Sequence, residues 1–191
     1  ESDYLARKGV KAYGLRFSPS GNGTVAVPML RDGRVVGLQI IRGKDRGNKL
    51  EKQYWPAGMD KVGAYHLIGG IPRGLVLVAE GYATAATLHE STGLPVAVAF
   101  DAGSLMPVVA DLAQKYRTSK ILICADDDYL TPGNPGCEAA RLAATAHGAA
   151  WCSPKFSEER STTKKGPTDY NDLANLEGPH VVANQITAHL E

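Results

Sequence analysis

The sequence lacks the long apolar runs and the leader segment that membrane and exported proteins carry. Its longest apolar stretches, residues 75–79, 96–100 and 121–125, have about five residues each, whereas a membrane-spanning helix needs about 20. No basic segment followed by an apolar one opens the chain, so we expect no export, no membrane partner and a cytoplasmic location. The first residue is Glu1 rather than Met, from which we expect a piece of a longer protein.

Cysteine is also scarce. The three cysteines, Cys124, Cys137 and Cys152, lie 13 and 15 residues apart, and the chain holds no C-x-x-C pair. Zinc sites need closely spaced ligands, and disulfide frameworks need an even number of cysteines. We therefore expect three free thiols, no zinc in this chain and a reducing environment.

Several common catalytic and nucleotide-binding motifs are missing. The chain has no G-x-x-x-x-G-K-[ST] loop and no G-x-G-x-x-G loop after a predicted strand. No Ser/His/Asp or Cys/His set falls at the strand ends, so the sequence shows no nucleophile for acyl transfer.

Charge is distributed unevenly along the chain. Residues 1–74 carry 13 Lys and Arg against 6 Asp and Glu, whereas residues 75–191 carry 8 against 14, so a net charge of +1 conceals a basic part and an acidic part. A protein that holds a polyanion beside metal-binding carboxylates needs such a division. Surface charge also segregates by chance, so the pattern alone does not identify a function.

The first 72 residues indicate a small, mostly β subdomain. We expect strands at 24–30 and 35–41, joined by an Asp-Gly turn at 31–34. This basic N-terminal subdomain covers residues 1–72 in our interpretation.

From residue 73 onward, apolar β-branched runs alternate with helical segments. We expect strands at 75–79, 96–100, 121–125 and 149–152, and helices at 83–90, 106–116, 136–147 and 181–190. The alternation is typical of an α/β fold with a buried parallel sheet, which we assign to residues 73–191. The one long irregular stretch covers residues 153–168, a length that is usually functional or disordered.

Acidic residues follow every predicted strand of the α/β domain. They are Glu80, Asp101, the three aspartates 126–128, and, after the long loop, Asp169 and Asp172. Ligands of an open parallel sheet bind at the carboxyl ends of its strands, so we expect these carboxylates to lie at one edge. Their mutual repulsion requires cations, and the hard divalent ions that prefer oxygen ligands are Mg²⁺ and, as alternatives, Mn²⁺ or Ca²⁺.

The spacing within the three aspartates predicts their roles. Asp126 and Asp128 share one side of an extended chain and can bind one metal, while Asp127 points away. Gly81, next to Glu80, allows a sharp backbone turn there. Each acid also has a simpler interpretation, since Glu80 suits a helix N-terminus and three aspartates suit a solvated turn. Two further acids at the same edge favour the metal site.

These residues resemble a known family. Glu80 followed by Asp126-x-Asp128 on later strands resembles the Toprim domain of primases, type IA and type II topoisomerases, and related nucleases. The string Glu80-Gly-Tyr-Ala-Thr-Ala85 is similar to the EGYATA motif of primases encoded by conjugative plasmids, integrated elements and satellite phages. The Toprim resemblance covers about residues 73–178 and implies a Rossmann-like parallel sheet flanked by helices.

The upstream segment carries a second resemblance. Residues 25–37, followed by Arg42 and the region of Lys49 and Lys52, resemble the basic N-terminal subdomain of bacterial replicative primases. The zinc-binding and helicase modules of such primases have no counterpart here, so the resemblance implies that they lie outside this chain.

The resemblance implies roles for the acids. Glu80, Asp126 and Asp128 correspond to the catalytic, metal-binding acids of Toprim domains, and Asp169 and Asp172 to further metal-binding acids of primases. It implies two Mg²⁺ or Mn²⁺ ions. Whether Glu80 binds metal or accepts a proton stays open.

The implied activity is that of a DNA primase, which synthesises short RNA primers on single-stranded DNA by metal-dependent nucleotidyl transfer, here in the replication of a plasmid, phage or mobile element. Its implied partners are single-stranded DNA, NTPs and a helicase domain or protein. For contacts with nucleotides or DNA we expect basic and aromatic residues of two segments: Arg42, Lys44, Lys49, Lys52, Tyr54, Trp55, Lys155, Lys164 and Lys165.

Two other functions fit parts of the pattern. A Toprim nuclease would use the same acids to cleave phosphodiesters. A non-catalytic single-strand-binding module of a replication protein would tolerate loss of the acids. The aromatic pair Tyr54 and Trp55 fits core packing as well as base stacking, and the lysines of residues 153–168 fit a solvated loop.

Overall fold

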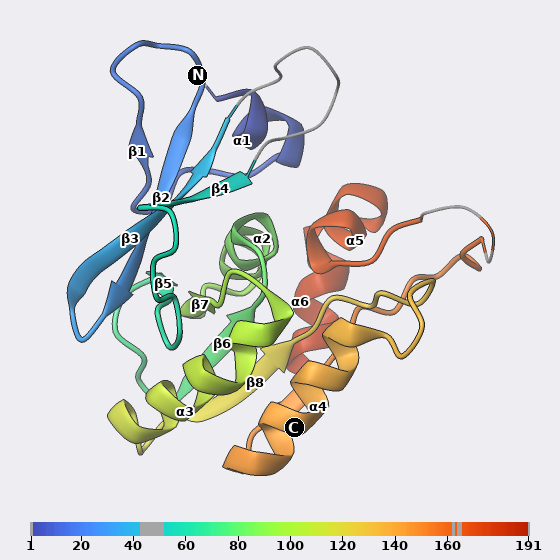
Figure 1. The fold of residues 1–191 in the computed structure, drawn as a ribbon. Helices are drawn as coiled ribbons and strands as arrows, with labels where there is room; N and C mark the ends of the chain where they lie inside the picture. The colour runs from blue at the N-terminus through green and yellow to red at the C-terminus, as the bar shows by residue number, and fades with distance from the viewer. Residues whose placement is uncertain (1, 43–51, 162, 164–165, 191) are drawn as a thin grey trace.

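Two β-sheets, one above the other in Figure 1, organise the fold. The computed structural model describes residues 2–42, 52–161, 163 and 166–190. The elements of the upper part are α1 (Asp3–Lys8), β1 (Arg16–Phe17), β2 (Val25–Arg31), β3 (Arg34–Ile41) and β4 (Lys52–Trp55). The elements of the lower part are β5 (His66–Ile68), β6 (Leu75–Ala79), α2 (Tyr82–Thr92), β7 (Val96–Val98), η1 (Ala102–Ser104), α3 (Leu105–Lys115), β8 (Lys120–Cys124), α4 (Pro135–His147), β9 (Ala150–Cys152), α5 (Tyr170–Glu177) and α6 (Pro179–Thr187).

The N-terminal sheet is antiparallel, with the strand order β1-β2-β3-β4. β2 and β3 form the predicted hairpin, and its turn residues Asp32 and Gly33 both have positive φ values, 51° and 74°. Such a turn matches the twist of the two strands and favours the Asp-Gly sequence found here. The predicted mostly β character of this part is therefore confirmed.

The second sheet has the order β5-β7-β6-β8-β9. β7, β6, β8 and β9 are parallel, and β5 pairs antiparallel with β7 at one edge. Alternate residues of β6 face opposite sides: Val76 and Val78 belong to one hydrophobic cluster, Leu77 and Ala79 to the other. Burial on both faces explains the continuous apolar run of this strand. The predicted α/β fold with a parallel sheet is confirmed.

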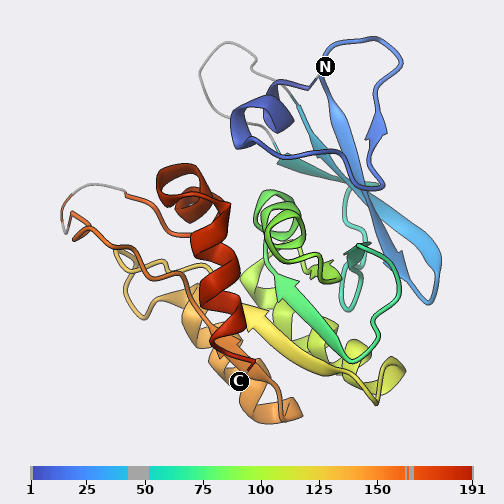
Figure 2. The ribbon, with the colours of Figure 1, turned by 180° about the vertical axis from the view of Figure 1, so that it is seen from behind.

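Helices cover both faces of this sheet. α3 and α4 pack against one face, while α2, α5 and α6 cover the other, which is the near face in Figure 2. Within the described part of the chain, no helix combines the length and apolar character that a membrane crossing requires.

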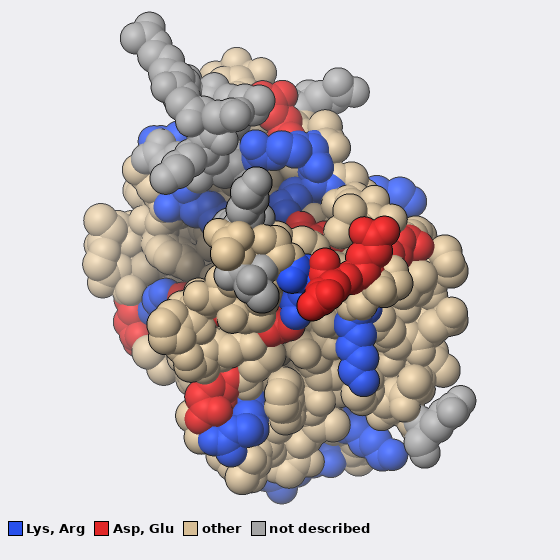
Figure 3. Space-filling view, turned by 90° about the vertical axis from the view of Figure 1, so that its right-hand side faces the viewer, with Lys and Arg blue, Asp and Glu red and all other residues tan. Residues whose placement is uncertain are grey.

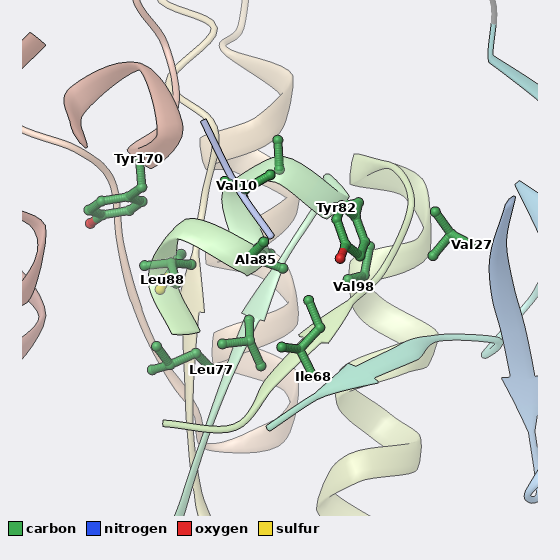
Figure 4. Packing of buried hydrophobic residues seen from close by; sticks show 14 of the residues in the cluster. Val10, Val27, Ile68, Leu77, Tyr82, Ala85, Leu88, Val98 and Tyr170 are labelled. Atoms are coloured by element: carbon green, nitrogen blue, oxygen red, sulfur yellow. The ribbon is translucent and has the colours of Figure 1, made fainter. Parts of the chain in front are cut away.

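The two sheets share one hydrophobic core. Tyr4 of α1 and Val10 are buried in the same cluster as Tyr82 of α2, and Figure 4 shows Val10, Val27 and Tyr82 gathered above the parallel sheet. The Tyr82 hydroxyl donates to Lys11 O (3.0 Å) and accepts from the Tyr13 amide (2.6 Å). Tyr82, the tyrosine of the EGYATA motif, therefore links the N-terminal segment to α2 through hydrogen bonds.

Several elements differ from the sequence-based expectation, among them the short strands β1 and β4, which were not expected. α1 was not expected, and α5 begins at Tyr170, where we expected only an acid-bearing loop. β5, although it precedes residue 72, belongs to the parallel sheet, so the expected boundary between residues 72 and 73 falls in the connection between β5 and β6. The last helix begins at Pro179, two residues before the expected start.

Candidate functional site

The site is built at the carboxyl ends of the parallel strands. Glu80 follows β6 directly, and Asp126 follows β8 by two residues; because Ala79 and Cys124 are register partners, the two acids leave the sheet side by side. One carboxylate oxygen of each, Glu80 Oε1 and Asp126 Oδ1, is buried without a hydrogen-bond partner. Buried polar atoms without a partner are rare and indicate a missing ligand or ion.

Burial and mutual repulsion perturb both acids. Burial raises the pKa of Glu80 to about 7, with the charge of Asp128 as the next cause and those of Asp101 and Asp169 as smaller ones. Burial likewise raises the pKa of Asp126 to about 8, with contributions from Glu80, Asp169 and Asp128. The predicted convergence of acids from separate strands is therefore present in the fold.

These acids fit a hard divalent cation. A cation beside Glu80 Oε1 and Asp126 Oδ1 would supply the partner that both oxygens lack and offset the repulsion between the carboxylates. Among the described residues, no three His, Cys, Asp or Glu side chains converge closely enough to hold an ion by themselves. Mg²⁺ commonly binds through one or two carboxylates, with water and substrate phosphates as its other ligands.

The middle aspartate points away from this cluster, as the alternation of an extended chain predicts. Asp127 forms an ion pair with Arg160 (2.5 Å), and its other oxygen accepts a hydrogen bond from Asn134 (2.6 Å). Asp128 lies close enough to Glu80 to raise the pKa of that acid. Neither partner was anticipated: Arg160 comes from a distant loop, and Asn134 approaches Asp127 from the other end of the same connection between β8 and α4.

Asp169 and Asp172 lie at the N-terminus of α5, next to the cluster. The Asp169 side chain caps the helix by accepting from the Asp172 amide (2.8 Å), and burial raises the pKa of Asp169. Asp172 accepts from the Thr168 amide (3.0 Å) and lies 3.9 Å from the Lys8 ammonium. Asp169 is therefore near the other acids, whereas Asp172 is occupied by helix capping and an ion pair.

Basic side chains of the N-terminal part face the acids. The Lys52 side chain is exposed, but the protein atoms gathered around it partly desolvate the ammonium and lower the pKa of Lys52, as does the nearby Lys8, while Asp126 and Asp169 oppose this effect. Lys8 was not among the predicted residues, and α1 brings it here. Figure 3 shows acidic side chains across the middle of this face with basic side chains above and beside them.

A further cation lies at the end of β7. Lys61 pairs with Asp101, and its ammonium lies 4.7 Å from the centre of the Tyr54 ring. Burial raises the pKa of Asp101, but the hydrogen bonds from Lys61 and Ser104 outweigh it, so the pKa is lowered. The Lys61 pairing was not predicted from the sequence either.

The two predicted aromatic residues differ in exposure. Tyr54 is half-buried and packs against the core, with its hydroxyl 3.3 Å from Gln39 Nε2. Trp55, the next residue of β4, is 62% exposed. Core packing therefore describes Tyr54, whereas Trp55 is open for contact with a ligand.

The remaining predicted contact residues are scattered. Arg42 follows β3 and is exposed. Lys155 is exposed, and its backbone is bonded through both N and O to the Gln185 side chain of α6. Four predicted residues fall outside the described residues: Lys44, Lys49, Lys164 and Lys165.

Most of the EGYATA motif is buried packing. Tyr82, Ala83, Thr84 and Ala85 lie in the buried face of α2, so that only its first two residues border the acidic cluster. The freedom that Gly81 offers for a sharp turn is not used: its φ is −107°, which any residue adopts, and an added Cβ would lie 3.8 Å from the nearest atom, Thr84 Oγ1.

A different glycine, Gly136 at the start of α4, is the one that the site requires. A Cβ there would lie 2.3 Å from Asp126 O and 2.9 Å from Glu80 Oε1, both too close for a side chain. The first turn of α4 can approach the acids only because this position lacks a side chain. A glycine one residue into an alanine-rich helix is the sequence signal that could have indicated it.

Comparison with known proteins assigns the chain to a family. A model of the Toprim domain family matches residues 75–180, more than half of the chain, so the chain belongs to the Toprim domain family. It is 32% identical over 168 residues to the DNA primase TraC of Escherichia coli, an alignment that covers 83% of this chain and 11% of the relative. The chain thus spans about a tenth of the length of this relative. The resemblance expected from the motifs is confirmed.

Solved structures share the fold. The primase fragment of the bacteriophage T7 primase-helicase protein superimposes with a TM-score of 0.62 and 15% identity, covering 95% of this chain and 68% of that one. The DnaG catalytic core gives a TM-score of 0.56 and 14% identity, covering 98% and 70%. Both likenesses extend over nearly all of this chain, including the N-terminal sheet.

Proposed function

We propose that this chain is the catalytic core of a DNA primase, which synthesises short RNA primers on single-stranded DNA in the replication of a plasmid, phage or mobile element. The observation that carries the proposal is the pair of buried, unpartnered oxygens of Glu80 and Asp126 in a Toprim chain, with Lys52 of the N-terminal sheet near enough to Asp126 to interact with its charge. The sequence similarity to a DNA primase supports it. In this proposal residues 1–72 act as the basic N-terminal subdomain and residues 73–191 as the Toprim domain.

The acids are proposed to bind Mg²⁺ or Mn²⁺, with two ions in the active form. Glu80, Asp126 and Asp128 would provide the carboxylate oxygens, with Asp169 and Asp172 as further acids at the same edge. The chemistry that such ions supply is neutralisation of the nucleotide phosphates and a lowered pKa of the attacking 3′-hydroxyl. The protein's own contribution is to bury Glu80 and Asp126 so that their oxygens stay free of competing donors.

The N-terminal sheet is proposed to bind the polyanions. Lys52 is near enough to Asp126 and Asp169 to interact with their charges, so that a triphosphate at the acids would come within reach of its ammonium. Lys8 extends this positive charge, and the exposed Trp55 offers a ring on which a base can stack. Phosphate contacts of this kind make binding salt-dependent. The other predicted contact residues, Arg42, Lys44, Lys49, Lys155, Lys164 and Lys165, remain proposals.

The test is primer synthesis on single-stranded DNA with NTPs and Mg²⁺ or Mn²⁺. We expect short RNA products from the wild type, and a loss of at least about 100-fold in Asp126→Asn and Asp128→Asn, because each substitution removes a charged oxygen ligand. Asp60→Asn is the matched control, since Asp60 is an exposed acid of the N-terminal part that pairs with Arg31 on the surface. The control is expected to keep wild-type activity.

The same experiment separates the two other candidate functions. Shortened DNA without RNA products would favour the Toprim nuclease. Salt-sensitive DNA binding without chemistry, unchanged in both Asp variants, would favour a single-strand-binding module. Either result would contradict the primase proposal.

A further inference from the structure

Arg160 joins the long segment of residues 153–168 to the aspartates of the site. Its Nη2 lies 2.5 Å from Asp127 Oδ2, and its Nη1 donates to the Pro167 carbonyl (3.2 Å). The ion pair is largely shielded, because the two side chains are only 20% and 14% exposed. A shielded pair is screened less by water and salt than an exposed one.

Aromatic rings hold the guanidinium in place. Its central carbon lies 4.0 Å from the centre of the Tyr129 ring and 5.1 Å from that of Phe156. The Tyr129 hydroxyl in turn donates to Ser161 O (2.9 Å), next to Arg160 in the chain. A planar guanidinium can stack on rings and donate from two nitrogens at once, which a lysine ammonium cannot do in the same geometry.

The two partners of Arg160 lie next to acids of the site. Asp127 stands between Asp126 and Asp128, and Pro167 precedes Asp169 by two residues. The Asp127 amide also donates to Thr168 O (2.8 Å), directly before Asp169. The Arg160 side chain and the hydrogen bond from the Asp127 amide to Thr168 O therefore fix the distance between two groups of acids. One group follows β8, and the other is Asp169 at the start of α5.

Arg160 also neutralises a charge beside the cluster. The Asp127 carboxylate is adjacent to Asp126, whose pKa is raised by burial and then by the charges of Glu80, Asp169 and Asp128. Its oxygens are taken up by Arg160 and by Asn134 Nδ2, at 2.6 Å in the latter case. Without Arg160, an additional carboxylate oxygen would be available within this acidic loop.

We infer that Arg160 is a positioning residue of the active site: it fixes Asp169 relative to Asp126 and Asp128, and it keeps Asp127 out of the set of carboxylates that bind the cation. This inference rests on the proposed function, because the site that Arg160 positions is the metal site of that proposal. The inference assigns a role to the segment of residues 153–168 that does not depend on the lysines of this segment.

The positioning role is tested first by amide hydrogen exchange in Arg160→Ala. We expect exchange at the Asp127 amide, and at the amides of residues 168–172, to become at least about tenfold faster, because the bond to Thr168 O opens once the guanidinium is lost. Arg141→Ala is the matched control, since Arg141 pairs with Glu138 on an exposed face of α4 (2.7 Å) and is expected to leave this exchange unchanged. Circular dichroism checks that both variants are folded, and Arg160→Lys, which retains the charge, provides a second variant with an intermediate effect.

The charge role is tested by Mn²⁺ binding, followed through the electron paramagnetic resonance signal of free Mn²⁺. We expect Arg160→Ala to weaken binding by about 10-fold to 100-fold, the usual effect of losing a residue that orients metal ligands. Adding Asp127→Asn to Arg160→Ala should restore part of the affinity, because the unpaired carboxylate is then removed.

The outcomes separate this inference from the proposed function. Unchanged exchange in Arg160→Ala, or a double variant that binds Mn²⁺ no better than Arg160→Ala, would overturn the inference. A wild type that binds Mn²⁺ and shows both Arg160 effects but makes no primers would contradict the proposed function and leave the role of Arg160 standing.

Discussion

Glu80 and Asp126 are acids in surroundings that oppose their charge. Their raised pKa values, about 7 and about 8, come first from burial and then from neighbouring carboxylates. A protein that keeps such groups is less stable than it would be with neutral side chains of the same size. The arrangement therefore costs stability in the absence of a cation.

This cost predicts a pH dependence of the metal-free protein. The ordinary pKa values are 4.5 for Glu80 and 3.8 for Asp126, so between about pH 4 and pH 8 the folded state holds protons that the unfolded chain has released. Stability is then greatest at the acidic end of this window and falls as the pH rises through it. Asp126→Asn should be more stable than the wild type at pH 8, by about 2 kcal/mol, and should show a shallower pH dependence.

The measurement is urea unfolding in the presence of a chelator between pH 5 and pH 8. Glu158→Gln, which removes an exposed carboxylate, is the control and should follow the wild type. A wild-type stability that rises from pH 5 to pH 8 would contradict the burial of these charges.

At this scale the sequence predicted the acids but not their partners. Glu80, Asp126 and Asp128 follow predictable strands, and parallel strands bring their ends to one edge. Lys8 and Arg160 could not be found in this way, because each reaches the site through the packing of a distant segment that no local pattern encodes.

At the scale of elements, the start of α4 closes one side of the site. Gly136 lets the helix approach so closely that a Cβ would lie 2.3 Å from Asp126 O. Helical propensity favours alanine over glycine by about 1 kcal/mol, so the presence of glycine here reflects the contact rather than the helix.

We expect Gly136→Ala to lower the free energy of unfolding by about 1–3 kcal/mol, because the clash with a backbone carbonyl outweighs the gain in helical propensity. Gly81→Ala is the matched control: it changes the glycine next to Glu80, and its Cβ has room. Thermal unfolding by circular dichroism should show a clearly lower midpoint for Gly136→Ala and little change for Gly81→Ala. Equal midpoints would indicate that the α4 turn moves freely.

The elements themselves were predictable to different degrees. The strands β2, β3, β6 and β8 are marked by apolar runs rich in β-branched residues, and the helices α3 and α4 by an apolar face, and the fold has them within a few residues of the expected positions. β5 has only three residues, too few for a periodic signal, and exists because it pairs with β7. Asp169, the N-cap of α5, is a sequence signal for the start of this helix, but we interpreted Asp169 only as a metal-binding acid.

At the scale of the whole molecule, Tyr82 connects the two sheets. Its ring is buried beside Tyr4, and its hydroxyl bonds the backbone of Lys11 and Tyr13. His66 of β5 strengthens the connection, with one ring nitrogen 2.8 Å from Tyr13 O and the other 3.1 Å from Pro28 O in β2. We therefore expect the two sheets to unfold together.

Tyr82→Phe tests this coupling, because it keeps the ring and removes the hydroxyl. Losing two hydrogen bonds should cost about 1–3 kcal/mol. The two tryptophans report the two parts separately, Trp55 from the N-terminal sheet and Trp151 from the parallel sheet. In the single-tryptophan variants, Trp55→Phe and Trp151→Phe, both fluorescence transitions should coincide and shift together when Tyr82→Phe is added.

Tyr170→Phe is the control for that experiment, since Tyr170 is as buried as Tyr82 but its hydroxyl donates to the Cys152 sulfur (3.1 Å), a weak acceptor. It should cost less than Tyr82→Phe. Separate transitions for the two tryptophans would show that the sheets are independent.

The burial of the motif has a practical consequence for mutagenesis. A mutational scan of residues 80–85 that measured only product formation would identify Tyr82, Thr84 and their neighbours as catalytic residues, although they are buried residues that pack in the core. A thermal unfolding curve beside every activity assay would distinguish a variant that is inactive but folded, as expected for substitutions of Glu80, from one in which the contact between the two sheets is lost.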